Sequence, residues 1–213
     1  MAGNNIFAVT DLTLLKKDAT PEDFIQLTER AEKLEAYSVC VPPANVRFCH
    51  NLLVGKSPNV CTVIGFPNGY STLATKIFEI KEAIKNGANE VDVVLNIENI
   101  KSGCWDEVAK EAAFIKQTSS VPVKAIIETC LLTDEEIQKT IDILELSFID
   151  FVKTSTGFDK AGADIDTVRM MSDYIKKNSY DIKIMASGGI KTIMDAQEFI
   201  TAGASRIGAS NLI

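Results

Sequence analysis

The sequence predicts an α/β fold, a parallel (β/α)8 barrel that occupies residues 1–213 as a single domain. Eight short apolar runs rich in β-branched residues alternate with segments of helical periodicity, at a mean spacing of roughly 27 residues. Strict alternation of strand and helix requires a parallel sheet. Since no long linker or low-complexity stretch interrupts the eight units, a closed barrel is favoured over an open, doubly wound sheet.

The first half of the chain carries clear boundary signals. Thr20 and Pro21, followed by acidic residues, are typical of a helix start. Pro42 stops one strand, and Gly87 is a suitable C-terminal cap for a helix. The strands expected here span residues 6–12, 38–41 and 60–66, and the helices span 20–36, 46–53 and 71–86.

The same alternation continues to the end of the sequence. Strands are expected at residues 90–96, 123–128, 148–154, 182–187 and 205–209, and helices at 106–117, 134–144, 164–177 and 192–201. Too few residues follow the last strand for an eighth helix, so we expect one side of the barrel to be thinly covered.

Composition and charge exclude several classes of function. The 46% of hydrophobic residues suit one sizeable core, and no apolar run approaches the ~20 residues of a membrane span. A net charge of −7 argues against nucleic acid or an anionic membrane as a partner. Five cysteines without CxxC spacing or a recognisable secretory leader lead us to expect reduced thiols and a cytoplasmic protein. The single histidine, His50, leaves little material for a histidine-rich metal site, and we expect no metal.

A lysine lies where one predicted strand passes from apolar to small polar residues. Lys153 follows Phe151 and Val152 and precedes a Thr-Ser-Thr-Gly run. An inward-facing lysine among apolar groups loses hydration, which favours the neutral amine, and a neutral amine forms Schiff bases with aldehydes. Two interpretations are open, a catalytic amine and a strand-end lysine whose ammonium reaches solvent.

Other polar residues end the predicted strands at the face where such barrels carry their sites. They are Asp11, Cys40, Asp92, Asn96, Glu128, Ser155, Ser187 and Ser210. Asp92 interrupts an otherwise apolar strand, and a carboxylate inside a core is costly unless it is paired or functional. A structural ion pair and a catalytic role are equally open for Asp92.

Two glycine-containing turns, at residues 187–189 and 208–210, follow the last two predicted strands. The first opens the helix expected at 192–201, and backbone amides at a helix N-terminus bind anions. Tight turns need glycine in any case, but two of them after these strands favour a phosphate site. The candidate phosphate-binding residues are Gly157, Ser187, Gly188, Gly189, Lys191, Gly208 and Ser210.

These segments resemble the deoxyribose-phosphate aldolases, class I enzymes that use a lysine Schiff base, over essentially the whole chain. The resemblance is carried by DLTLL (11–15), VCVP (39–42), IGFPNG (64–69), GANEVDVV (87–94), KAIIET (124–129), KTSTGF (153–158), ASGG (186–189) and RIGAS (206–210). It implies a TIM barrel lyase, without a cofactor, that reversibly cleaves 2-deoxyribose 5-phosphate to acetaldehyde and glyceraldehyde 3-phosphate in deoxyribose phosphate catabolism.

By this resemblance Lys153 is the Schiff-base lysine, and Asp92 is the acid that acts through a bound water on the substrate hydroxyl. Asp11 belongs to the surrounding proton network, and the two glycine turns hold the phosphate. The implied partners are a phosphosugar and small aldehydes, with a homodimer open as the oligomeric state.

The family has a second lysine immediately before its Ala-Ser-Gly-Gly turn, and Met185 stands there in this chain. A neighbouring cation lowers the pKa of a lysine from about 10.4 and so raises the neutral fraction, which methionine cannot do. Lys183 lies two residues earlier on the same strand and ~6–7 Å deeper, and it is a weak candidate to compensate. We therefore expect the natural activity to be reduced or redirected. Natural divergence and an engineered removal of charge both fit the change.

Three classes of function remain open. The first is an aldolase weakened by Met185 or redirected to iminium catalysis on unsaturated aldehydes. The second is an impaired protein that only binds phosphosugars, and the third is another phosphate-handling barrel, such as an isomerase or cyclase. Only the first predicts a covalent adduct when the protein is reduced with borohydride in the presence of an aldehyde.

Overall fold

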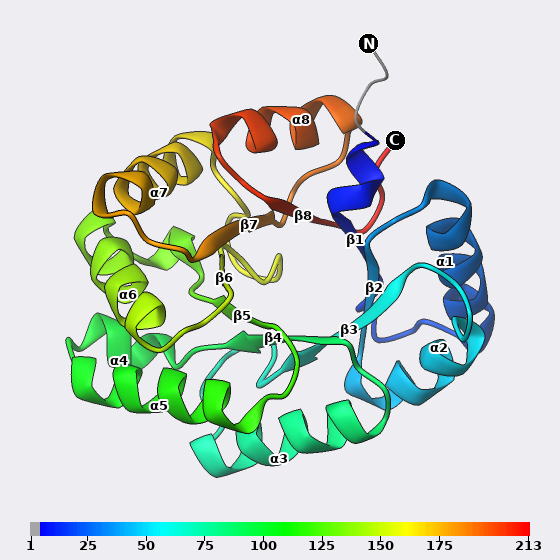
Figure 1. Ribbon diagram of the computed structural model, residues 1–213, viewed down its shortest axis with the longest axis horizontal. Coiled ribbons are helices and arrows are strands. Elements are labelled where there is room, and N and C mark those ends of the chain that lie inside the picture. The colour runs from blue at the N-terminus through cyan, green and yellow to red at the C-terminus, as the bar shows by residue number, and fades with distance from the viewer. Residues whose placement is uncertain (1–4) are drawn as a thin grey trace.

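A computed structural model describes residues 5–213, and within this range eight parallel strands close into a barrel surrounded by helices (Figure 1). Each strand pairs with the next, and β8 pairs with β1, where Gly208 lies opposite Asp11. The strands are β1 (Thr10–Thr13), β2 (Ser38–Val41), β3 (Asn59–Ile64), β4 (Glu90–Val94), β5 (Val123–Ile126), β6 (Phe151–Lys153), β7 (Lys183–Ser187) and β8 (Arg206–Ala209). The predicted (β/α)8 fold is confirmed.

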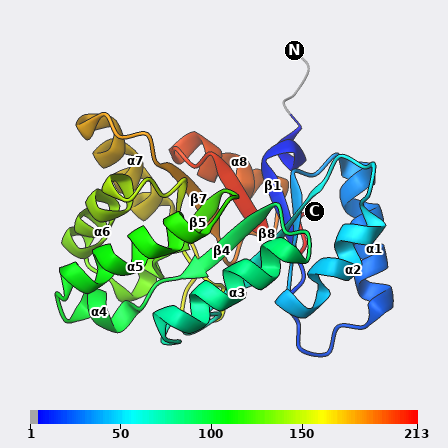
Figure 2. The same cartoon turned by 60° about the horizontal axis from the view of Figure 1, so that its bottom comes forward.

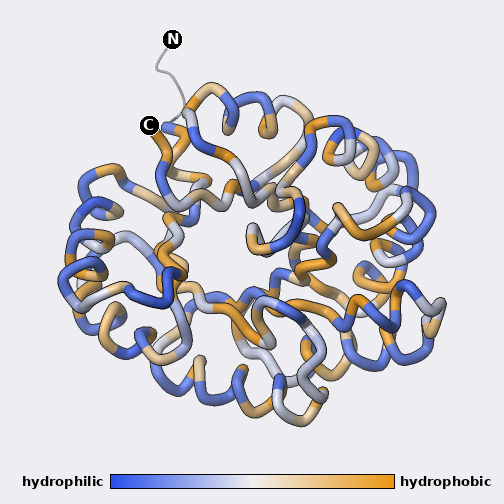
Figure 3. Tube along the Cα trace, turned by 180° about the vertical axis from the view of Figure 1, so that it is seen from behind, coloured by the Kyte–Doolittle hydropathy of each residue, from blue (hydrophilic) through white to orange (hydrophobic). Residues whose placement is uncertain are grey.

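The helices lie outside the barrel, as the tilted view of Figure 2 shows, and they pack one apolar face against the strands. Along them polar and apolar residues alternate in patches (Figure 3), the pattern of helices with one buried side. They are α1 (Pro21–Leu34), α2 (Val46–Leu52), α3 (Leu73–Lys85), α4 (Ile97–Lys101), α5 (Trp105–Thr118), α6 (Asp134–Leu146), α7 (Ile165–Asn178) and α8 (Ile193–Ala202). Short 3-10 turns are η1 (Ile6–Val9), η2 (Pro43–Asn45) and η3 (Thr129–Leu131).

Several predicted boundaries differ from the structure. Residues 6–9 were expected to begin the first strand but form η1, because the Asn5 side chain accepts a hydrogen bond from the Phe7 amide and caps the turn. The short helix α4 was not predicted, and it begins where the Asn96 side chain accepts a bond from the Glu98 amide. Phe148, expected to open a strand, is exposed and has a φ of 57°, so β6 begins at Phe151.

The sector between α8 and α1 lacks a helix after β8 within residues 5–213, as the sequence predicts. There η1 and the segment after β8 fill the ring between α8 and α1 (Figure 1). Arg30 on α1 donates to the Asn211 side chain (3.0 Å) and to the carbonyl of Leu212 (2.8 Å). The Ile213 carbonyl accepts a hydrogen bond from the Ile193 amide at the start of α8. The last residues thus tie α1 to α8.

The apolar core lies between strands and helices, whereas the inside of the barrel is largely polar and charged. Inward-facing positions bring buried charged side chains from β1, β4, β5, β6 and β8 together near the axis. Among the helices described for residues 5–213, none has the length and hydropathy needed to cross a bilayer.

Candidate active site

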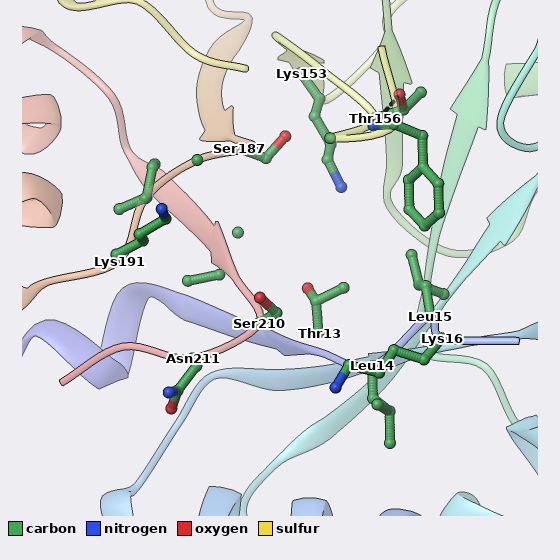
Figure 4. Close-up of a pocket in the computed structure, with 17 residues that line it drawn as sticks. Thr13, Leu14, Leu15, Lys16, Lys153, Thr156, Ser187, Lys191, Ser210 and Asn211 are labelled. Atoms are coloured by element: carbon green, nitrogen blue, oxygen red, sulfur yellow. Dashed lines mark hydrogen bonds between the residues drawn. The ribbon is translucent and has the colours of Figure 1, made fainter. Parts of the chain in front are cut away.

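A cavity of about 440 Å³ opens at the C-terminal end of the barrel. Lys153 reaches into it from the end of β6, facing Thr13 and Ser210 across the space and with Ser187 beside it (Figure 4). The loop after β6, residues 154–164, curls over the middle of the barrel (Figures 1 and 3). The cavity brings together Lys153 and all seven predicted phosphate-binding residues, whereas Asp11, Asp92 and Met185 do not line it.

Lys153 and Asp92 form a direct ion pair inside the barrel. Only 4% of Lys153 is exposed, and its Nζ lies 2.5 Å from Oδ2 of Asp92, which is fully buried. Burial alone would lower the pKa of Lys153, but the Asp92 carboxylate outweighs it and raises that pKa above the ordinary value. Desolvation thus favours the neutral amine, as the sequence argument expects, while the contact with Asp92 favours the ammonium.

Asp92 is held as a carboxylate by two ammonium groups. Burial raises its pKa, but Lys124 and Lys153 outweigh this effect and keep the pKa well below the usual range. Lys124 on β5 donates to Oδ1 of Asp92 at 2.8 Å, so each carboxylate oxygen faces one lysine. Asp92 therefore fits both interpretations, because it forms a buried ion pair and its carboxylate also contacts the candidate nucleophile.

Asp11 lies deeper in the barrel, where it contacts two basic groups. Its Oδ1 accepts a hydrogen bond from Arg206 at 2.9 Å, and its Oδ2 lies 3.2 Å from Nζ of Lys124. Because Lys124 also contacts Asp92, Asp11 is linked to Lys153 through two residues, Lys124 and Asp92. Lys124 and Arg206 were not predicted as interior residues, although the alternation along β5 places Lys124 on the same face as Ile126, the register partner of Lys153.

Among residues 5–213, two groups of potential metal ligands occur inside the barrel, Cys40 with Cys61 and Asp92, and Asp11 with Cys61 and Glu90. Nζ of Lys124 lies 3.2 Å from the Cys61 sulfur and 2.7 Å from Oε2 of Glu90. An ammonium thus already provides the positive charge between these ligands. Burial raises the pKa of the Cys61 thiol, which disfavours the thiolate that a metal would require.

The turn between β7 and α8 supplies backbone donors to the cavity. Gly188 and Gly189 have φ values of 87° and 80°, and their amides donate to no other residue in the described range 5–213. The helix start contributes less than predicted, because the Asp195 carboxylate accepts the amides of Lys191 (3.3 Å) and Thr192 (3.0 Å). An anion here would meet the glycine turn rather than the first amides of α8.

The glycines differ in how closely they are packed. A Cβ at Gly188 would lie 2.9 Å from the Cα of Gly162, and one at Gly208 would lie 2.8 Å from the methyl carbon of Met185. A Cβ at Gly189 would meet nothing within 4 Å and would extend into open space. Gly189 is therefore the position at which a side chain would compete with a ligand rather than with the fold.

Met185 and Lys183 lie on β7 at very different depths. Met185 is fully buried and is the register partner of Lys153 on the adjoining strand. Lys183 is exposed, and its Nζ lies 5.8 Å from the centre of the Phe151 ring. It lines a separate cavity at the opposite end of the barrel. Lys183 therefore cannot compensate for a missing amine beside Lys153.

The remaining predicted mouth residues have structural partners. Asn96 caps α4, and the Ser187 hydroxyl donates to the carbonyl of Ser155. Glu128 accepts hydrogen bonds from the Thr156 amide and hydroxyl, and burial raises its pKa. Cys40 is buried beside Cys61.

Sequence reasoning missed the wall of the cavity that β1 and the β6 loop provide. Additional lining residues are Thr13, Leu14, Leu15, Lys16, Thr156, Phe158, Ile190, Ala209 and Asn211. Phe158 packs edge-on against Phe66 with ring centres 5.2 Å apart. Thr13, Leu14, Leu15, Thr156, Phe158 and Ala209 belong to segments that carry the family resemblance, which was the available signal for them, whereas Lys16, Ile190 and Asn211 lie outside those segments.

The family pattern and the curated relatives indicate the same family. The sequence pattern of the DeoC/LacD family of aldolases matches residues 6–212. A protein from Clostridioides difficile (strain 630) named deoxyribose-phosphate aldolase is 45% identical over 98% of this chain and 94% of its own length.

Solved structures give the same result. QR15, described as an aldolase, superposes with a TM-score of 0.91 at 36% identity, over 96% of this chain and 91% of its own. The tetrameric deoxyribose phosphate aldolase from Aeropyrum pernix superposes with a TM-score of 0.86 at 31% identity, over 96% and 86% of the two chains.

Proposed function

This chain belongs to the DeoC/LacD family of aldolases, and on that premise we propose that it is a lyase that cleaves 2-deoxy-D-ribose 5-phosphate into acetaldehyde and D-glyceraldehyde 3-phosphate. The observation that carries the proposal is the position of Lys153, whose buried amine ends in a cavity that also contains the free amides of Gly188 and Gly189. A phosphate bound at that turn would direct the aldehyde end of an open-chain sugar toward the amine.

The reaction follows from the chemistry of the amine. Neutral Lys153 attacks the aldehyde carbon, and the resulting carbinolamine loses water to give an iminium. Removal of the proton from the hydroxyl at C3 then breaks the C2–C3 bond. The electron pair moves to the iminium, which becomes an enamine, and glyceraldehyde 3-phosphate leaves. Protonation of the enamine at carbon and hydrolysis release acetaldehyde and restore the amine.

Asp92 is the group placed to handle protons near Lys153. Its carboxylate lies 2.5 Å from the amine and can accept the proton that the lysine must lose. After imine formation the ammonium is gone, and Asp92 is then free to act on the substrate hydroxyl through a water molecule. Asp11 is separated from Asp92 by Lys124, and its carboxylate offsets part of the positive charge of Lys124.

We also propose that Met185 reduces this natural activity or redirects it toward more electrophilic aldehydes. The support is the buried register pair of Met185 and Lys153, which leaves the amine without a cation on β7, together with the raised pKa of Lys153. Because a smaller fraction of Lys153 is neutral at neutral pH, imine formation is slower. The reaction then requires a higher pH or a more electrophilic substrate, such as an unsaturated aldehyde.

Reductive trapping tests the function directly. The protein is incubated with acetaldehyde and a borohydride, digested, and mapped by mass spectrometry, with Lys153→Met as the matched control. A stable adduct on Lys153 that is absent from the variant supports the proposal. A label found chiefly on Lys124 or Lys183, or no adduct at any pH, would overturn it and favour a phosphosugar-binding protein or another phosphate-handling barrel.

A further inference from the structure

The charged groups inside the barrel form a continuous column from its base to Lys153. Arg206 contacts Asp11 (2.9 Å) and Oε2 of Glu90 (3.3 Å), and Glu90 contacts Lys124 (2.7 Å). Lys124 in turn holds Oδ1 of Asp92, whose other oxygen holds Lys153. At the base, Arg206 and Glu90 line the second cavity, which is about 600 Å³.

Opposite charges in this column match one for one. Of the residues the structure describes, those whose charged groups join the column are the basic Lys124, Lys153 and Arg206 and the acidic Asp11, Glu90 and Asp92. Each of the six is at most 5% exposed. Because buried charges are weakly screened, a change at one member of the column is felt by the others.

The other side chains around Lys153 are mostly apolar groups, thiols and a hydroxyl. They are Ile126 on β5, Met185 on β7, the thiols of Cys40 on β2 and Cys61 on β3, and Ser155 beyond β6, with the carboxylate of Glu128 acting at longer range. Asp92 is thus the anion in direct contact with Lys153. The other groups that contact Asp92 therefore control the strength of its ion pair with the Lys153 ammonium.

We propose that Lys124 and Glu90 are positioning residues that set the ionisation of Lys153 through Asp92, an inference that rests on the proposed Schiff-base function. Lys124 competes with Lys153 for the charge of Asp92 and so weakens the Asp92–Lys153 pair. Glu90, with Asp11, offsets part of the charge of Lys124 and limits that competition. Neither residue touches the cavity that would hold the substrate.

Removing the charge of Glu90 should therefore increase the neutral fraction of Lys153. In Glu90→Gln the barrel column keeps its basic groups but loses one anion, so Lys124 binds Asp92 more strongly and the Lys153 ammonium becomes less favourable. Glutamine can preserve the fold here, because its carbonyl can accept from Lys124 and Arg206 as Oε2 does. The other oxygen, Oε1, accepts no hydrogen bond from the described residues, so an amide nitrogen there displaces no contact.

The test measures the rate of reductive trapping by subsaturating acetaldehyde and cyanoborohydride from pH 5 to 10. This profile reports the ionisation of the free enzyme's amine. For Glu90→Gln we expect the midpoint to fall by about one pH unit, with about tenfold more trapping below the midpoint. For Lys124→Met we expect the midpoint to rise, and Lys124→Arg, which keeps the charge, should restore it toward the parent value.

Glu111→Gln is the matched control. Glu111 is also buried and paired with a buried lysine, Lys76, at 2.5 Å, but the pair lies between α3 and α5 outside the barrel. The Glu111→Gln variant should be less stable than the parent, but the midpoint of its trapping rate against pH should be unchanged. A midpoint in Glu90→Gln equal to that of the parent would overturn the proposal, even if Lys124→Met fails to fold. Absence of trapping in the parent at every pH would instead refute the Schiff-base function, so the two failures are distinguishable.

Discussion

Met185 leaves the β7 side of Lys153 without a cation. The two residues are register partners, and both are nearly or fully buried. With Asp92 in contact and no cation at position 185, the balance of charges favours the ammonium, as the raised pKa of Lys153 reflects. A lysine at position 185 would add a fourth basic group to the column. Repulsion between the cations would then make the protonated form of one of these groups less favourable.

We therefore expect Met185→Lys to raise the retro-aldol rate at neutral pH. A cation beside Lys153 lowers its pKa, and a shift of about two units gives about a hundredfold more neutral amine, or roughly 2.7 kcal/mol. The measurement is turnover of 2-deoxyribose 5-phosphate against pH for both proteins, in which the lower limb should move toward neutrality.

Met185→Leu is the control for packing, because it keeps an apolar side chain of similar volume. Its pH profile should match that of the parent. If the parent already turns over fully near pH 7 and neither variant shifts the profile, then position 185 does not govern the ionisation of Lys153.

At the scale of the element, the turn between β7 and α8 combines an open cavity wall with a capped helix. Asp195 occupies the amides of Lys191 and Thr192, which leaves Gly188 and Gly189 as donors. The capping partner three residues into α8 was readable from the sequence, since threonine followed three residues later by aspartate resembles a capping box. The backbone donors left for a phosphate are therefore those of the predicted glycine turn rather than those of the helix end.

Gly189→Val should weaken phosphate binding. The valine side chain would enter the open space at the turn and obstruct the anion, and we expect the affinity for glycerol 3-phosphate to fall roughly tenfold or more. Glycerol 3-phosphate has no aldehyde, so calorimetry with it measures the phosphate contact without imine formation.

Gly55→Val separates binding from backbone strain. Gly55 has a φ of 78° and, like Gly189, nothing within 4 Å of a Cβ, but it does not line the cavity. Both variants should lose similar stability, because a side chain at positive φ costs about 1–2 kcal/mol. Equal affinity in the two variants would contradict a phosphate site at Gly189.

The elements were predictable from sequence wherever a local signal decided them. Periodicity and the turns at Pro42 and Gly87 located the strands and helices, and glycine turns located one wall of the site. The short helix α4 and the turn at residues 6–9 depend on single capping side chains, so periodicity missed them. The direct ion pair of Lys153 with Asp92 was not predicted either, because Asp92 is 61 residues away and only closure of the barrel brings the two together.

At the scale of the whole molecule, the charged column makes the stability of the barrel depend on pH. Asp92 has a pKa lowered from an ordinary value of 3.8, so its contribution to stability is present above that value and lost as pH falls through the folded-state pKa. Lys124 and Lys153 have raised pKa values, so their contributions are present below about 10.5 and lost only as pH rises further. Between these limits Asp92, Lys124 and Lys153 are all charged.

The acid side of this dependence can be assigned to Asp92. In Asp92→Asn two buried ammonium groups lose their shared counter-charge, and breaking a buried ion pair from one side costs about 3–5 kcal/mol at pH 7. Toward pH 3 the parent begins to lose the same interaction, so the difference in unfolding free energy between parent and variant should shrink. Urea unfolding at pH 7, 5, 4 and 3 measures it.

Asp166→Asn supplies the comparison that excludes a general effect of removing a carboxylate. Its pair with Arg169 is exposed, with 87% of the Asp166 side chain accessible, and exposed pairs contribute little to stability. That variant should follow the parent at every pH. If the gap between the parent and Asp92→Asn stays constant from pH 7 to pH 3, the ionised state of Asp92 is not what holds the interior of the barrel together, and the stability would have to come from packing of the surrounding strands alone.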